Sequence, residues 1–268
     1  MDAQRDRQAV KLEPAPARVV VAFWTITARC VRLSRRNVDG LVTSLALPVL
    51  LMILFVYLFG GAITTGIKAG YVDYVVPGVL LLCAGFGAAS TAVSVCQDMT
   101  GGMIDRLRSL DVPGAAVLGG HVTASLARNC VSTAIVFGVA FAIGFRTHAS
   151  AASLLGVVGM LAVFALALSW LAAVVGLLAR SAEAASGFTF FVMFLPYPSS
   201  TFVPISTMPG WLQGFARNQP VTPMVQTLRG LLLGSPVGDA PWRALAWCGG
   251  VLLVSVTASG ALFRRRIR

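Results

Sequence analysis

The sequence predicts an all-α integral membrane protein with six transmembrane helices. Of its 268 residues, 57% are hydrophobic and only 12% are charged, and the mean hydropathy is +0.81. In an ordinary soluble domain, about a quarter of the residues are charged. The formal net charge is +11, but the basic residues stand mainly at the ends of apolar runs, as is typical of membrane proteins. We therefore expect membrane lipids, and not nucleic acid, as the partner of this charge.

Six apolar runs are long enough to be candidate spans. A helix rises about 1.5 Å per residue, so about 20 apolar residues cross the hydrocarbon core of roughly 30 Å. The first run supplies this length without one charged side chain. The expected transmembrane domain covers residues 41–263, with spans at 41–60, 75–97, 122–145, 152–179, 187–203 and 242–263. The fifth span is the least regular, because prolines crowd its end.

Lysine and arginine are distributed unevenly between the two sides of these spans. If the N-terminus is cytoplasmic, residues 1–40, 98–121 and 264–268 lie in the cytoplasm, and so does the short connection after the fourth span. On this assignment, 16 of the 21 basic residues are cytoplasmic. This bias is the one that orients membrane proteins. We therefore expect a multi-pass protein of the inner or plasma membrane, with both termini in the cytoplasm.

Ahead of the first span, residues 17–37 predict an amphipathic helix that lies in the membrane interface. Apolar side chains, among them Phe23 and Trp24, fall on one face of this helix, and basic side chains fall on the opposite face. The basic positions include Arg18, Arg29, Arg32 and Arg36. Such a helix binds anionic lipid through its basic side chains. A plain basic anchor before the first span is the alternative.

The longest cytoplasmic connection between spans, residues 98–121, contains a second short helical pattern. Apolar side chains recur there at helical spacing, and charged side chains occupy the positions between them. The apolar residues are Met103, Ile104, Leu107 and Leu110, and the charged residues are Asp105, Arg106 and Arg108. Pro113 and Gly114 are expected to end the helix. From periodicity alone, a helix floating among the headgroups is favoured over one that docks on another protein.

Prolines exclude a continuous span between the fifth and sixth apolar runs. Eight of the 13 prolines lie between Pro196 and Pro241. The segment also contains Trp211, Phe215 and the run 224–233, which are too apolar for a free loop. Backbone that enters a membrane without crossing it must be shielded by protein or line a cavity.

We therefore expect residues 204–238 to form a pair of short re-entrant helices on the extracellular side. Thr222 is the expected N-cap of the second helix, and Gly234 suits its far end. The candidate gate residues are Pro209, Trp211, Phe215, Asn218, Pro220, Pro223 and Arg229. A surface loop with two interfacial anchors remains nearly as compatible with the sequence.

The sequence contains none of the motifs that would indicate an enzyme. A phosphate-binding GxxxxGK[ST] loop, a metalloprotease HExxH and a GxSxG elbow do not occur. The five cysteines form no CxxC pair, and His121 and His148 lie far apart at expected span ends. We therefore expect no catalytic residue, metal site or bound cofactor in this chain.

Charged residues are almost absent from the expected spans. All ten acidic residues lie outside the spans or at their edges. Ion-coupled secondary transporters usually keep carboxylates inside the membrane, so this distribution argues against such a transporter. Arg128 is the exception among the basic residues, and near the end of the third span it is expected to extend to the headgroups.

The whole pattern resembles the permease subunits of type-two ABC exporters, in particular those similar to the daunorubicin-resistance transporter. In the loop after the second span, that family typically has an acidic residue, a glycine, an ERLR-like stretch and Leu-Pro-Val. The matching positions are Asp98, Gly101, Asp105, Arg106, Leu107, Arg108 and Leu110. Residues 217–234 resemble the family's Asn-Pro-containing run before the last span. Asp111 stands where the family usually has the proline, which is a departure from the pattern.

This resemblance implies a half-transporter. It implies that residues 98–121 contain a coupling helix that docks on a separate ATPase subunit, and it favours re-entrant helices in residues 205–233. Two permease chains, identical or different, would pair above two copies of the ATPase, which bind Mg-ATP. The exported compound would be lipophilic or amphiphilic, either a drug or a lipid-like molecule. The alternatives are an ion-coupled secondary transporter, a permease for a lipid-linked glycan, and a membrane-embedded lipid-modifying enzyme.

Overall fold

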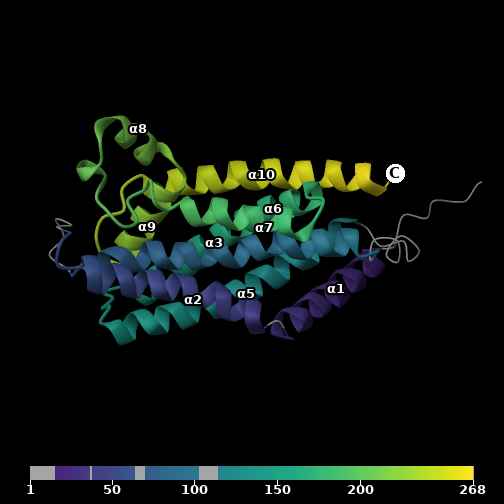
Figure 1. The fold of residues 1–268 in the computed structure, drawn as a ribbon, viewed down its shortest axis with the longest axis horizontal. Helices are drawn as coiled ribbons and strands as arrows, with labels where there is room; N and C mark the ends of the chain where they lie inside the picture. The colour runs from purple at the N-terminus through teal and green to yellow at the C-terminus, as the bar shows by residue number, and fades with distance from the viewer. Residues whose placement is uncertain (1–15, 37, 64–69, 103–113, 268) are drawn as a thin grey trace, which may run out of the picture.

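The computed structural model describes residues 16–36, 38–63, 70–102 and 114–267, and these residues form a bundle of helices without a β-strand (Figure 1). The helices are α1 (Pro16–Arg36), α2 (Val38–Leu54), α3 (Tyr71–Thr100), α5 (Gly114–Ile143), α6 (Ala151–Leu178), α7 (Ala182–Phe194), α8 (Gly210–Asn218), α9 (Val221–Leu233) and α10 (Ala240–Ile267). A π-helical turn at Phe55–Phe59 continues α2. The expected all-α fold is confirmed for this part of the chain.

Four of the helices, α3, α5, α6 and α10, are long and apolar enough to cross a membrane. Two shorter apolar helices are Leu45–Phe59, which combines the part of α2 from Leu45 onward with the π-helical turn, and Ala182–Phe194, which is α7. The 13 residues of α7 extend about 20 Å, which is less than the roughly 30 Å of a hydrocarbon core. Six spans therefore stays a prediction.

The fifth expected span, residues 187–203, is only partly helical. Its helix begins earlier than expected, at Ala182, and ends at Phe194, after which the chain continues in turns. Pro196 and Pro198 lack amide hydrogens, which explains why the helix cannot continue.

The chain from Ala179 to Phe202, which includes α7, nevertheless runs along most of α3. Near the last turn of α3, the thiol of Cys96 donates to the carbonyl of Ala179 at 3.8 Å. At the first residue of α3, the hydroxyl of Tyr71 donates to the carbonyl of Phe202 at 2.9 Å. The helix and the turns together therefore pass from one end of the bundle to the other.

Two ends of the bundle can be distinguished in Figure 1. α8 and α9 lie at one end, and α1 lies at the other, near the end of α10. We call these the α8 end and the α1 end. α3 finishes and α5 starts at the α1 end, so the expected coupling loop connects two helices there.

α3 is the central helix, and it packs on α2, α5, α6, α7 and α9. Small residues allow the close contacts that this position requires. A Cβ added at Gly85 would lie 2.7 Å from Val192 of α7, and one added at Gly176 of α6 would lie 2.5 Å from the Ala92 carbonyl of α3. The backbones of α3 and α6 are therefore in direct contact.

Replacing Gly176→Ala is expected to destabilise the bundle, because the new methyl group would collide with backbone that cannot rotate away. Overpacking of this kind costs roughly 1–3 kcal/mol. The measurement is the midpoint of thermal unfolding in detergent. Gly159→Ala is the control in the same helix, because nothing lies within 4 Å of a Cβ there. Equal midpoints for the two variants would contradict the proposed contact.

Candidate functional site

A polar cluster at the α1 end joins α1 to α3 and α5. The Asp98 carboxylate of α3 accepts two hydrogen bonds from the guanidinium of Arg29, at 3.0 and 3.3 Å. Nε2 of His121, from α5, lies 3.0 Å from the same carboxylate. On the other side of the imidazole, the Cys30 sulfur of α1 lies 3.8 Å from Nδ1. We call these four residues the α1-end cluster.

The charges of the α1-end cluster are partly buried, so each one needs its partner for compensation. The side chain of Asp98 is 17% exposed and that of His121 is 7% exposed. The hydrogen bond to Asp98 raises the pKa of Arg29 above its ordinary value, so the guanidinium keeps its charge. A buried ion pair tolerates the loss of one member poorly, because the other charge is then left without compensation.

The order cysteine, histidine and aspartate also occurs in enzymes that use a thiol nucleophile. Here the Cys30 side chain is only 8% exposed and packs in a core cluster with Ile26 and Leu118. A substrate carbonyl has no approach to a sulfur held in this way. The geometry therefore supports a structural role for the α1-end cluster, which ties three helices together.

The α1-end cluster brackets the expected coupling loop. Asp98 stands in the last turn of α3, and Gly101 follows that helix, with its amide donating to the Gln97 carbonyl at 2.8 Å. His121 lies in the second turn of α5, on the other side of the loop. The remaining candidate coupling residues lie outside the described residues: Ile104, Asp105, Arg106, Leu107, Arg108 and Leu110.

The N-terminal segment is the helix α1, as expected, but its faces differ in part from the prediction. Trp24 and Arg32 are exposed, whereas Phe23 packs on Gly119 of α5. Arg29, which was expected to bind anionic lipid, instead binds Asp98 of α3. The side chains of Arg18 and Arg36 lie outside the described part of the chain.

A second correction concerns Arg128, which does not extend to the headgroups. Its Nη2 donates to the Gly87 carbonyl at 3.1 Å and to the Ser90 hydroxyl at 2.6 Å, both on α3. Gly87 is 11 residues from Asp98, or about 16 Å along the helix. Nearby, the hydroxyls of Ser125 and Ser169 lie 2.9 Å apart and join α5 to α6. A charge at this depth is held by the bundle itself.

A third polar group, the α8-end cluster, consists of Arg229, Tyr74 and Ser200. Nε and Nη2 of Arg229 donate to the Tyr74 carbonyl at 3.2 and 3.0 Å, and Nη2 also donates to the Ser200 carbonyl at 2.8 Å. The guanidinium carbon lies 3.7 Å from the centre of the Tyr74 ring, a cation–π contact. Arg229 thus joins α9 to the start of α3 and to the turns after α7.

Side chains near the start of α9 also supply donors and acceptors to these turns. The Gln219 amide donates to the Pro198 carbonyl, and the Thr222 hydroxyl accepts from the Ser200 amide at 3.4 Å. The prediction that Thr222 is the N-cap is wrong, because α9 begins at Val221. The prediction for Gly234 is confirmed, since it ends α9 with φ 69°.

The other candidate gate residues fall into two groups. Trp211 and Phe215 of α8 are 81% and 59% exposed, and Asn218 ends that helix. Pro209 and Pro220 directly precede α8 and α9, and Pro223 is buried in α9. The structure therefore separates an exposed helix, α8, from a packed helix, α9.

The two clusters and Arg128 come together from residues that are far apart in sequence. Arg29 and Asp98 are 69 residues apart, and Arg229 and Tyr74 are 155 apart. Sequence reasoning identified Asp98 and Arg229 as candidates, but it missed His121, Tyr74 and Ser200 as their partners. No spacing in the sequence indicates these pairings.

Residues 21–233, which include both clusters, match the protein family described as "ABC-2 type transporter". The chain belongs to the ABC-2 type transporter family. It is 29% identical over 254 residues to the daunorubicin resistance ABC transporter permease protein DrrB1 of Streptomyces coeruleorubidus, and the alignment covers 94% of this chain and 89% of that protein. With its long apolar helices, this ABC-2 protein is a multi-pass membrane protein.

Two further ABC-2 relatives come from Mycobacterium tuberculosis. The probable doxorubicin resistance ABC transporter permease protein DrrC is 24% identical over 250 residues, covering 93% of this chain and 91% of the relative. The doxorubicin resistance ABC transporter permease protein DrrB is 23% identical over 267 residues, covering 91% and 89%. The family resemblance expected from the loop and the proline-rich run is therefore confirmed over most of the chain.

Replacing Asp98→Asn is expected to release α1 from α3. Hydrogen bonds to charged groups contribute about 1.5–3 kcal/mol, so the equilibrium constant for separation of α1 from α3 should rise roughly tenfold or more. Exposure of the buried Cys30 thiol reports this separation. Its rate of alkylation by N-ethylmaleimide, followed by mass spectrometry, should rise by the same factor. Asp239→Asn, at an exposed ion pair, is the control, and an unchanged Cys30 rate in D98N would contradict the role of the α1-end cluster.

Proposed function

We propose that this chain is the permease subunit of an ATP-binding-cassette exporter and has no ATPase site of its own. The observation that carries the proposal is the match of residues 21–233 to the ABC-2 family. Alignment of 91–94% of the chain with drug-resistance permeases supports it. The cargo would be a lipophilic or amphiphilic compound, either a drug or a lipid-like molecule. The exporter would lie in the cell membrane.

In this proposal, the α1 end is cytoplasmic and receives the mechanical input. Two copies of a separate ATPase subunit bind Mg-ATP and contact the coupling segment, residues 98–110. The position of the α1-end cluster supports this assignment, because Asp98 and His121 hold the two helices that flank the segment. Movement of the segment would then move α1, α3 and α5 together, as a rigid body.

The α8 end would form the extracellular gate. α9 is fixed to α3 and to the turns after α7 by Arg229, whereas α8 exposes Trp211 and Phe215. Exposed aromatic side chains are typical of the membrane interface. The two short helices would therefore lie at the outer leaflet, with α9 as the part that responds to α3.

A second permease chain, identical or different, would pair along α7. One face of α7 is uncovered by its own chain, and Phe190, Phe191 and Phe194 on that face are 63%, 55% and 60% exposed. These three phenylalanines lie together and form an apolar surface that a partner helix could cover in place of lipid. The export pathway would then lie between the two chains.

The coupling role is tested by reversing two charges in the segment, with Arg106→Glu and Arg108→Glu together. The permease is reconstituted with its ATPase partner in vesicles, and ATP hydrolysis and cargo transport are measured in parallel. We expect hydrolysis to continue while transport falls at least about tenfold, since like charges at a docking contact repel. Reversal of Arg180 and Arg265, both exposed, should leave both activities unchanged.

Three outcomes would contradict the proposal. Full coupled transport in R106E/R108E would favour the alternative in which this segment does not dock on the ATPase. Transport that persists without ATP and collapses with the proton gradient would favour an ion-coupled secondary transporter. ATP-driven movement of a lipid-linked glycan, with no movement of smaller amphiphiles, would favour the glycan permease.

Pairing along α7 predicts a specific disulfide between two permease chains. Phe191→Cys, introduced into a chain whose five native cysteines are replaced by serine, should cross-link to a second chain bearing a cysteine on the same face. Val158→Cys is the control, because Val158 is 59% exposed on α6. Oxidation in membranes followed by gel electrophoresis gives the readout. Equal cross-linking at both positions, or none at Phe190, Phe191 and Phe194, would place the partner elsewhere.

A further inference from the structure

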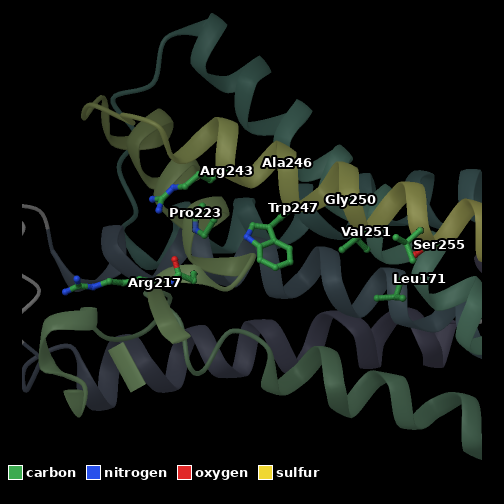
Figure 2. A pocket seen from close by; sticks show the side chains of 11 residues that line it. Leu171, Arg217, Pro223, Arg243, Ala246, Trp247, Gly250, Val251 and Ser255 are labelled. Atoms are coloured by element: carbon green, nitrogen blue, oxygen red, sulfur yellow. The ribbon is translucent and has the colours of Figure 1, made fainter. Parts of the chain in front are cut away.

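An open groove of about 600 Å³ lies between α6, α8, α9 and α10, on the lateral surface of the chain (Figure 2). Its middle is apolar, with Trp247, Gly250 and Val251 of α10 on one side. Figure 2 shows Arg217 and Arg243 at one end of the groove, and Leu171 and Ser255 at the other. No residue of α7 lines it, so the groove is separate from the face proposed for pairing.

The rim of the groove at the α8 end carries a net positive charge. Arg217 and Arg243 are both exposed. Nε of Arg243 lies 3.2 Å from the Asp239 carboxylate, with which it forms an ion pair. Nη2 of Arg217 donates a long hydrogen bond, 3.5 Å, to the side-chain carbonyl of Gln213. An exposed pair within one helix contributes little, and among the described residues Asp239 pairs with Arg243 only. Arginine N–H groups suit the planar, bidentate recognition of phosphate.

The length of the groove matches one leaflet of a bilayer. Ser255 is 12 residues from Arg243 along α10, which corresponds to about 18 Å, or somewhat more than half of a hydrocarbon core of roughly 30 Å. Trp211 and Trp242, both strongly exposed, mark the headgroup level at the arginine end. The arginines therefore lie at the headgroups, and the apolar walls lie among the acyl chains.

The inner end of the groove holds one polar atom. The Ser255 side chain is buried, and its hydroxyl has no hydrogen-bond partner among the described residues. Gly250 lines the groove between Trp247 and Ser255, and a Cβ added there would have no atom within 4 Å. The groove thus has two arginines at one end, and its walls beyond them are almost wholly apolar.

We propose that this groove binds one anionic phospholipid of the surrounding bilayer. Its phosphate contacts Arg217 and Arg243, and one acyl chain lies along Trp247 and Val251 toward Ser255. A second copy of the chain fits this surface less well, because a symmetric contact would bring the same two arginines of each copy together. The inference does not rest on the transport function, since any bilayer around the bundle presents such lipids.

The test uses quenching of tryptophan fluorescence by lipids with brominated acyl chains. The full-length protein is placed in mixed micelles with brominated phosphatidylglycerol or brominated phosphatidylcholine of the same chain length. The Trp247 contribution is the quenching that Trp247→Phe abolishes. We expect half-quenching at an about fivefold lower mole fraction of phosphatidylglycerol than of phosphatidylcholine.

Variants of Arg217 and Arg243 then test whether these two residues cause the preference for phosphatidylglycerol. Arg217→Gln with Arg243→Gln should abolish the preference, whereas Arg217→Lys with Arg243→Lys should retain most of it. Arg180→Gln with Arg265→Gln removes the same charge from exposed positions outside the groove and should change nothing.

Three results would overturn the proposal. Equal quenching by the two lipids in the unmodified protein would exclude selective binding. A preference that survives R217Q/R243Q would place the anionic lipid elsewhere. Failure of either lipid to quench Trp247 would mean that another chain or a bound cargo covers the groove.

Discussion

The fold depends on how the backbone after α7 is paired. Pro196 and Pro198 end the helix while the chain still has to pass along α3, and lipid offers no hydrogen bonds to the turns that follow. Arg229 and Gln219 supply the missing donors. Because the same guanidinium also binds the Tyr74 carbonyl, α9 cannot leave α3 without exposing polar backbone. The end of α7 and the packing of α9 therefore depend on the same hydrogen bonds.

α3 connects the α8-end cluster to the α1-end cluster. Tyr74 and Asp98 are 24 residues apart, about 36 Å along one helix, and α3 is buried over most of this length. Coupling between distant sites requires an element that moves as a unit. Close contacts at Gly85 and Gly87 hold α3 against its neighbours. Under the proposed function, movement of the coupling segment would reach α9 through α3 itself, and no chain of separate side-chain contacts is needed.

The sequence predicted the helical fold and, among its six expected spans, the four long apolar helices, because length and hydropathy act locally. It placed the end of the fifth span at residue 203, whereas α7 ends at Phe194, just before Pro196 and Pro198. It did not predict the partners of Arg29 and Arg128. Periodicity shows which residues share a face, but lipid and protein interior are both apolar, so the pattern does not distinguish a face that meets lipid from one that meets another helix. The N-cap prediction for Thr222 failed because α9 begins one residue before it, at Val221. Its hydroxyl instead donates to the Ala216 carbonyl at 2.6 Å and accepts from the Ser200 amide at 3.4 Å.

These pairings also change how the charge asymmetry should be interpreted. A count of basic residues treats each one as available to the headgroups, but Arg29 binds Asp98, and Arg128 and Arg229 bind carbonyls within the bundle. Two of these three belong to the side with many basic residues and one to the side with few, so the bias persists without them. The residues that remain at the α8 end include Arg217 and Arg243, which are both exposed, and Arg243 forms an ion pair with Asp239. Under the proposed topology these two arginines lie on the side with few basic residues, and the groove beside them has the shape and polarity for an anionic lipid.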